Sequence, residues 1–179
     1  MGQLDLPKNF EGTICDFGCG LGDAFPIYHA AFPNAKLVGV DFSRSAIEKC
    51  RQRYGQIADF ILGDQAVVPK VDIIISSAVF EHLTDDITHA KYLQGKCRQL
   101  FIAVPYKEKP LDYEHVNRYD EHYFKGLGRY RWVVYDCPGW SEYGFRLVWQ
   151  VYLKNLIRPF CSRRIKSRNM FILFHFNQY

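Results

Sequence analysis

A glycine-rich segment with one acid, Asp16-Phe17-Gly18-Cys19-Gly20-Leu21-Gly22, contains the first residues whose types and spacing could do chemistry. It follows an apolar run at 13–17 that predicts a short buried strand, and it precedes a predicted helix at 24–32. Glycines let backbone amides approach a ligand closely, and a helix N-terminus attracts polar or negative groups. A dinucleotide fingerprint would need the spacing G-x-G-x-x-G. The last position is Asp23 when counted from Gly18 and Phe25 when counted from Gly20, so a nicotinamide oxidoreductase is not indicated.

Two more acids stand at the ends of the next two predicted strands. Asp41 closes the strand at 36–40, where an acid can accept hydrogen bonds from both hydroxyls of a ribose. Phe42 beside it can cover one face of a purine. Asp64 follows the predicted strand at 59–62, at a place where the exocyclic amine of adenine can donate to it. Three signals at strand ends, in this order, predict a nucleoside site.

Taken together, these residues resemble the class I S-adenosylmethionine-dependent methyltransferases, and more narrowly the type 11/12 methyltransferase domain group, over about residues 12–106. The resemblance implies a single-domain, Rossmann-like α/β fold with helices on both faces of a seven-stranded sheet. The implied strand order is 3-2-1-4-5-7-6, with an antiparallel last strand at 169–176. It also implies S-adenosylmethionine as cofactor and S-adenosylhomocysteine as product.

By the same resemblance, Asp16 and the glycines hold the methionine end of the cofactor and Asp41 holds its ribose. The adenine is expected against Asp64 and Gln65. The full set of expected cofactor-binding residues is Asp16, Gly18, Cys19, Gly20, Gly22, Asp41, Phe42, Asp64, Gln65 and Ser77.

The segment after the fourth predicted strand, Ser76 to Leu83, supplies candidates for acid–base chemistry. It is similar to the family's segment ending in Glu-His-Leu. It lacks the Asn/Asp-Pro-Pro-Tyr/Phe loop that enzymes methylating nucleobase or glutamine nitrogens usually have here, so we expect a small-molecule acceptor, methylated at oxygen. An oxygen nucleophile of high pKa benefits from a nearby imidazole or carboxylate. Glu81, His82 and His115 are the catalytic candidates by position.

Each of these three residues also has an interpretation without a catalytic role. His82 can cap the following helix or line the methionine pocket, Glu81 can be a solvated charge, and His115 can be an exposed loop histidine. Six scattered cysteines, without C-x-x-C pairs near histidines, indicate free buried thiols and predict no metal site.

Alternating strand-like and helix-like segments must position these groups. Val71 to Ser76 is almost wholly apolar, as is typical of a strand covered on both faces, and Ser43 is the predicted N-cap of a helix that ends before Gly55. Repeated βαβ units form an open parallel sheet that binds ligands beyond the carboxyl ends of its strands. The remaining predicted elements are a helix at 84–93, a strand at 99–104, a polar loop at 107–119, a short helix at 120–127, a strand at 131–135, a helix at 144–158 and a strand at 169–176.

No repeat, linker or low-complexity tract divides the 179 residues, so a single domain over 1–179 is predicted. Most members of the family have helices before strand one that roof the active site, whereas here strand one begins near residue 13. We therefore expect the acceptor site or its lid to come from two insertions, 107–122 and 140–168, unless a second chain contributes.

Charge is distributed unevenly along the chain, although its net value is only +4. Residues 1–142 carry 16 basic and 19 acidic groups, or −3, and residues 143–179 carry seven basic groups and no acid, or +7. The predicted helix at 144–158 has one polar stripe and a wide apolar face. It can pack as a lid or lie on an anionic membrane. Its membrane interpretation suggests a sugar or glycolipid precursor as acceptor, with peripheral membrane or glycolipid contact through 144–168.

The N-terminus shows no basic segment followed by an apolar run, and no stretch of 18 apolar residues occurs, which predicts a cytoplasmic protein. Two other function classes stay open. One is a methyltransferase-like binding subunit without turnover. The other is a nucleic-acid methyltransferase that uses the basic C-terminal region, which is less favoured because charge runs are usually solvated faces. The sequence pattern leaves the oligomeric state open.

Overall fold

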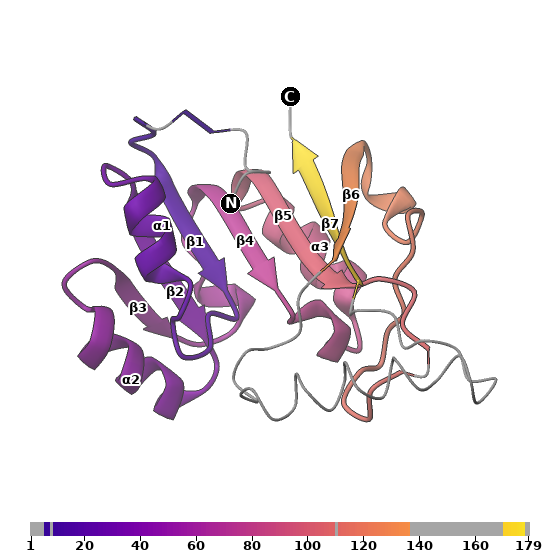
Figure 1. Ribbon diagram of the computed structural model, residues 1–179, viewed down its shortest axis with the longest axis horizontal. Coiled ribbons are helices and arrows are strands. Elements are labelled where there is room, and N and C mark those ends of the chain that lie inside the picture. Colours follow the sequence, from indigo (N-terminus) through magenta and orange to yellow (C-terminus); the bar gives the residue numbers. More distant parts are fainter. Residues whose placement is uncertain (1–5, 8, 110, 137–169, 178–179) are drawn as a thin grey trace, which may run out of the picture.

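The computed structural model describes residues 6–7, 9–109, 111–136 and 170–177. They form a seven-stranded sheet of order β3-β2-β1-β4-β5-β7-β6, in which β1 to β5 are parallel and β7 is antiparallel to both β5 and β6 (Figure 1). This confirms the expected Rossmann-like α/β fold. The strands are β1 (Thr13–Phe17), β2 (Lys36–Asp41), β3 (Asp59–Leu62), β4 (Val71–Ser77), β5 (Cys97–Pro105), β6 (Tyr130–Asp136) and β7 (Met170–Asn177).

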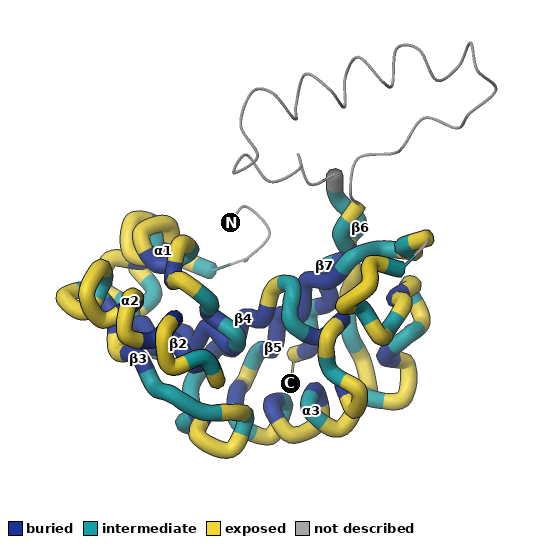
Figure 2. Tube along the Cα trace, turned by 90° about the horizontal axis from the view of Figure 1, so that it is seen from below, coloured by how far each residue is buried: buried dark blue, intermediate teal, exposed yellow. Residues whose placement is uncertain are grey.

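Helices cover the two faces of the sheet in separate groups (Figure 2). Phe25 of α1 and Ile47 of α2 share one core with alternate strand residues such as Ile14. Leu93 of α3 lies in a second core with the neighbouring strand residue Cys15, because successive side chains of a strand point to opposite faces. The helices are α1 (Phe25–Ala31), α2 (Arg44–Tyr54) and α3 (Asp86–Gln94), and the 3₁₀ turns are η1 (Gln65–Val67), η2 (Phe80–His82) and η3 (Lys125–Leu127).

Local sequence signals account for several of these elements. Residues 73–76 of β4 are all buried, as expected for a strand covered on both faces. Ser43 caps α2 by accepting a hydrogen bond from the Ala46 backbone N–H, and the helix ends at Tyr54, as predicted. The four described cysteines are free and buried, which confirms the expectation for Cys15, Cys19, Cys50 and Cys97.

Other expectations were wrong. The helix predicted at 120–127 is reduced to η3, because Asp120 Oδ1 accepts a hydrogen bond from the His122 backbone N–H at 2.9 Å, and such local bonds compete with helical backbone bonds. Gly128, with φ of +100°, then ends the turn. α3 starts two residues later than predicted, and β5 extends beyond 99–104 at both ends. The predicted helix at 144–158 and the insertion at 140–168 lie outside the described residues.

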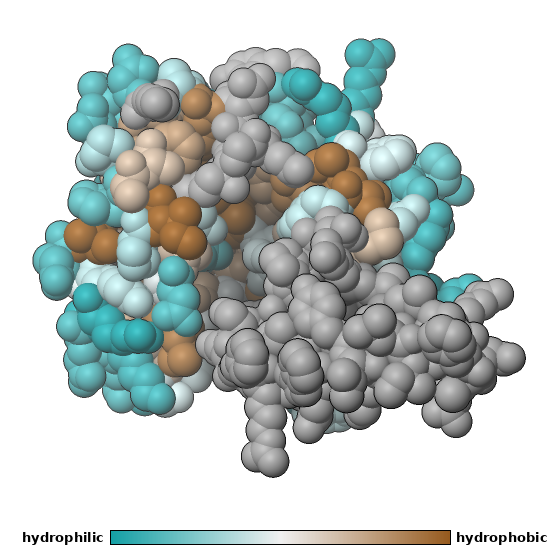
Figure 3. Space-filling model, viewed as in Figure 1, coloured by the Kyte–Doolittle hydropathy of each residue, from teal (hydrophilic) through white to brown (hydrophobic). Residues whose placement is uncertain are grey.

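The sheet brings the candidate residues to one edge. The carboxyl ends of β1, β2, β4 and β5 all point toward the lower edge of the view in Figure 1. On the face seen there, hydrophobic residues gather over the middle of the sheet, and hydrophilic residues prevail at the left margin (Figure 3). In the described part of the chain, no helix has the length and apolar character needed to cross a membrane.

Candidate functional site

The glycine-rich segment forms a tight loop between β1 and α1. The backbone N–H groups of Gly18 and Cys19 both donate to the carbonyl oxygen of Val40, at 2.8 and 3.1 Å, which folds the loop back onto the end of β2. Gly18, Gly20 and Gly22 all have positive φ, a region that glycine enters without steric cost.

The three glycines serve different purposes. A Cβ on Gly18 would lie 2.3 Å from Val79 Cγ2, and one on Gly22 would lie 2.9 Å from Cys50 Sγ, so both permit close packing within the protein. Apart from its chain neighbours, no atom of the described residues would lie within 4 Å of a Cβ on Gly20. Among these residues Gly20 therefore borders open space, into which a ligand can approach the backbone.

Asp41, at the end of β2, ties the loop to the next helix. Its Oδ2 accepts a hydrogen bond from the Gly20 backbone N–H and its Oδ1 accepts one from the Ser43 backbone N–H, both at 2.8 Å. The residue is buried, whereas the adjacent Phe42 is 84% exposed. Each carboxylate oxygen has a second lone pair, so Asp41 can still accept bonds from a ligand beside the exposed ring of Phe42.

Asp16 is buried at the end of β1. The pKa of its carboxyl is raised to about 7, mainly by burial; a hydrogen bond with Tyr28 lowers this pKa and the nearby Asp41 raises it. The carboxyl is therefore only partly ionised near neutral pH. A cationic group on a ligand would favour the ionised form.

The remaining expected cofactor residues lie around this edge with different exposure. Asp64 is exposed and caps η1, since its Oδ1 accepts a hydrogen bond from the Ala66 backbone N–H at 2.8 Å; Gln65 begins that turn. Ser77 is exposed at the end of β4. The side chain of Cys19 is buried in the core, so only its backbone can face a ligand.

The three catalytic candidates come together in one cluster. One ligand atom from each of Glu81, His82 and His115 lies within 4.8 Å of the others, and the two imidazole rings meet edge to face at 4.9 Å. Glu81 is only 2% exposed, so its interpretation as a solvated charge is wrong. Among the described residues its Oε2 has no hydrogen-bond partner. Burial raises the pKa of the Glu81 carboxyl, and a backbone hydrogen bond and the two histidines only partly offset this.

The loop after β5 holds His115 against η2. The Val116 backbone N–H donates to Glu81 O at 2.8 Å, and the Asn117 amide donates to Leu83 O at 2.6 Å. His115 is half-buried rather than freely exposed, and its Nδ1 lies 2.6 Å from Glu108 Oε2. The interpretation of His82 as a helix cap is also wrong, because α3 begins after Asp85 and His82 Nδ1 instead lies 3.2 Å from Glu114 O.

The residues that anchor this loop were not predicted from the sequence. Tyr119 is fully buried and donates to Asp86 Oδ2 at 2.8 Å, and Tyr123 donates to Asp86 Oδ1 at 3.2 Å. These bonds join the loop to the first turn of α3. The only available signal was the density of aromatic residues in a polar segment, which does not identify a partner 33 residues away.

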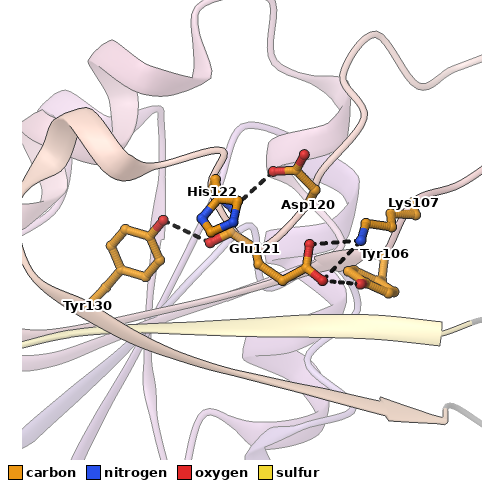
Figure 4. Close-up of polar contacts among 6 residues, drawn as sticks. All are labelled: Tyr106, Lys107, Asp120, Glu121, His122 and Tyr130. Atoms are coloured by element: carbon orange, nitrogen blue, oxygen red, sulfur yellow. Dashed lines mark hydrogen bonds and ion pairs between the residues drawn. The ribbon is translucent and has the colours of Figure 1, made fainter.

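A second polar group lies on the same loop (Figure 4). The Glu121 carboxylate accepts hydrogen bonds from the Tyr106 hydroxyl and from Lys107 Nζ, and these two bonds, the first above all, lower its pKa to about 2. Tyr130 donates to the backbone oxygen of Glu121 at 2.9 Å. A cavity of about 350 Å³ lies beside this group, lined by Lys107, Lys109, Arg118, Tyr119 and Asp120. Among the described lining residues, Lys107 is already paired with Glu121 and Asp120 is acidic, so Lys109 and Arg118 are the cations that suit an acidic ligand.

Comparison with known proteins places this geometry in context. Residues 15–99 match the methyltransferase domain family. The chain is 28% identical over 90 residues to trans-aconitate 2-methyltransferase from Rhodopseudomonas palustris, covering 49% of this chain and 35% of that protein. It is 37% identical over 78 residues to malonyl-[acyl-carrier protein] O-methyltransferase from Anoxybacillus flavithermus, covering 40% and 29%. The matches thus span about a third of these relatives' length.

Among solved structures, the fold resembles the plantazolicin methyltransferase BpumL, crystallised with a triazolic desmethylPZN analog and SAH. The TM-score is 0.61 at 16% identity, and the alignment covers 93% of this chain and 77% of that one. At this identity the likeness concerns the fold.

Proposed function

We propose that this chain, whose residues 15–99 match a methyltransferase domain family, is a class I S-adenosylmethionine-dependent methyltransferase that methylates a small-molecule acceptor, at oxygen. The observation that carries this proposal is the open space at Gly20, bordered by the carboxyl-bearing strand ends of β1 and β2. An exposed aromatic ring, Phe42, stands beside it.

The residues present suit S-adenosylmethionine part by part. Asp16 suits the ammonium of the methionine end, because that cation would stabilise a buried carboxylate that is otherwise partly protonated. Asp41 retains lone pairs for two ribose hydroxyls, and Phe42 offers a free face to the purine. Asp64 and Gln65 flank the expected adenine position. When bound, the cofactor supplies a methyl group on a positively charged sulfur.

The remaining proposed contacts are made by backbone or by small side chains. Gly18, Gly20 and Gly22 shape the loop, Cys19 contributes through its backbone because its side chain is buried, and Ser77 is exposed at the end of β4. These groups position the cofactor and exclude water, which is most of what a methyl transfer requires of a protein.

The residues expected to face the methyl acceptor suit an acidic molecule that is methylated at an oxygen atom. The cluster of Glu81, His82 and His115 stands after β4 and offers polar atoms to such an oxygen. Lys109 and Arg118, which line the cavity on the neighbouring loop, support an acceptor with a carboxylate or phosphate. The names of the two relatives above specify trans-aconitate and a malonyl group, which are acids. A sugar or glycolipid precursor remains a prediction, since it was based on residues 144–168.

Turnover is tested by incubating the full chain with S-adenosylmethionine, labelled in the transferable methyl, and the small-molecule fraction of a cell extract. We expect label in acidic small molecules and release of S-adenosylhomocysteine, and neither with Gly20→Val, whose side chain would fill the open space. Release of S-adenosylhomocysteine only with the RNA fraction would instead indicate a nucleic-acid acceptor. A chain that binds the cofactor but shows no release with either fraction would be a binding subunit, contrary to the proposal.

A further inference from the structure

The cluster formed by Glu81, His82 and His115 has the composition of a metal site. Two imidazoles and one carboxylate each present a ligand atom within 4.8 Å of the others. The Glu81 carboxylate is buried, and its Oε2 lacks a hydrogen-bond partner in the described part of the chain. A buried, unpaired carboxylate oxygen is costly unless a cation or a donor compensates it.

The hydrogen bonds of the two histidines prepare them as ligands. His115 Nδ1 lies 2.6 Å from the Glu108 carboxylate, and His82 Nδ1 lies 3.2 Å from the backbone oxygen of Glu114. Both partners are acceptors, so each neutral ring carries its proton on Nδ1 and keeps the lone pair of Nε2 free. Metal-binding histidines typically donate from one ring nitrogen to a carboxylate or carbonyl while the other binds the ion.

We propose that Glu81, His82 and His115 bind a divalent cation, with Glu108 and the backbone of Glu114 orienting the two histidines. Mixed nitrogen and oxygen donors favour Mn²⁺, Fe²⁺, Co²⁺ or Zn²⁺ over Mg²⁺ and Ca²⁺, which prefer oxygen ligands. Bonds of about 2.0–2.2 Å place the ligand atoms of a tetrahedral site about 3.4 Å apart, so donor atoms that are now up to 4.8 Å apart must approach one another by up to about 1.4 Å. The exposed side chain of His82 leaves room for this movement.

The position of this site relates it to methyl transfer. Val79, two residues before Glu81, contacts Gly18 of the glycine loop so closely that a Cβ there would lie 2.3 Å from it. Three protein ligands leave coordination positions free for a substrate. An acceptor with two adjacent oxygen atoms, such as a vicinal diol or a hydroxy acid, would occupy them. This last role rests on the proposed function, whereas binding of the ion does not.

Cobalt provides a direct probe, because its visible absorption reports ligand type and geometry. The full chain, free of any histidine tag and freed of metal with a chelator, is titrated with Co²⁺, and Zn²⁺ is then added as a competitor. We expect one Co²⁺ per chain and displacement by Zn²⁺. Glu81→Gln and His115→Ala should each weaken Co²⁺ binding by about 100-fold, and Glu108→Gln by about tenfold.

His29→Ala is the matched control, since His29 is exposed on α1, outside the cluster, and should bind Co²⁺ like the wild type. A second measurement needs no variant: substoichiometric Mn²⁺ should broaden the ring resonances of His82 and His115 and leave those of His29 sharp. Absence of Co²⁺ binding at millimolar concentration, or equal binding by Glu81→Gln, would overturn the inference, as would equal broadening of all histidines.

The same preparations are titrated with S-adenosylhomocysteine, so that the two proposals are separated. Binding of S-adenosylhomocysteine without Co²⁺ binding overturns the metal site and leaves the methyltransferase function intact. Binding of Co²⁺ without S-adenosylhomocysteine supports the metal site and contradicts the cofactor proposal.

Discussion

Replacing Asp16 by asparagine should stabilise the free protein and weaken its binding of the cofactor product. The substitution keeps the shape of the side chain and an oxygen that can accept from Tyr28, and it removes a carboxyl whose pKa burial raises to about 7. A residue with a purely structural role would not show these opposite effects. Higher stability combined with weaker ligand binding is expected when a buried carboxylate binds a cationic ligand.

The size of the expected stability change follows from proton linkage at Asp16. With a folded pKa of about 7 against an ordinary value of 3.8, the folded chain binds more protons than the unfolded chain between these pH values. The stability contributed by this carboxyl is therefore full below the unfolded pKa and is lost as the pH rises through about 7. The free energy of unfolding is lowered by about 4 kcal/mol at pH 8 and by about 2 kcal/mol at pH 5, relative to its value below the unfolded pKa.

Urea unfolding of the wild type and of Asp16→Asn at about pH 5 and pH 8 measures this effect. The variant should be more stable, and its advantage should grow by about 2–3 kcal/mol between the two pH values. Calorimetric titration with S-adenosylhomocysteine at the higher pH should show affinity reduced by about tenfold or more, because a bond to a charged group is lost. A variant that is less stable at pH 8, or that binds S-adenosylhomocysteine as well as the wild type, would refute the reasoning.

Three other substitutions test the roles assigned to Gly20, Phe42 and Tyr119. Gly20→Ala should cost only about 1–2 kcal/mol of stability yet block S-adenosylhomocysteine, whereas Gly18→Ala, against Val79, should lower the urea midpoint more strongly; equal effects would contradict the distinction. Phe42→Ala should weaken S-adenosylhomocysteine by about 1–2 kcal/mol in calorimetry without changing the melting temperature, and a lowered melting temperature would indicate a structural role. Tyr119→Phe removes a donor to the buried carboxylate of Asp86 and should destabilise the chain by about 1–3 kcal/mol in urea; an unchanged midpoint would show that the loop is not anchored there.

The parallel half of the fold was predictable from the sequence because its signals are local. Apolar runs mark the strands, Ser43 marks the start of α2, and the acids at strand ends fall at one edge of the sheet by topology alone. The absence of the helix predicted at 120–127 could not be inferred from hydrophobic spacing, because it depends on a hydrogen bond from the His122 backbone N–H to the Asp120 side chain and on the two glycines at 126 and 128.

The candidate site was predictable in composition but not in its environment. The sequence around Glu81 alone indicates a charged side chain at the surface. It is buried because residues more than 30 positions later fold over it, with the Val116 backbone bonded to its carbonyl oxygen and Asn117 bonded to Leu83. Contacts of this length leave no periodic pattern. The pairing of His115 with Glu108, on which the inferred metal site depends, is hidden for the same reason.

Calorimetric titration of the full chain with S-adenosylhomocysteine tests the central claim most directly, with a dinucleotide such as NAD as the comparison ligand. We expect one S-adenosylhomocysteine bound per chain, no binding of NAD, and loss of binding in Gly20→Val. Gly128→Val should bind normally, because Gly128 also has positive φ and also has no atom of the described residues near its Cβ position. No binding of S-adenosylhomocysteine at high micromolar concentration, or equal binding of NAD, would contradict it.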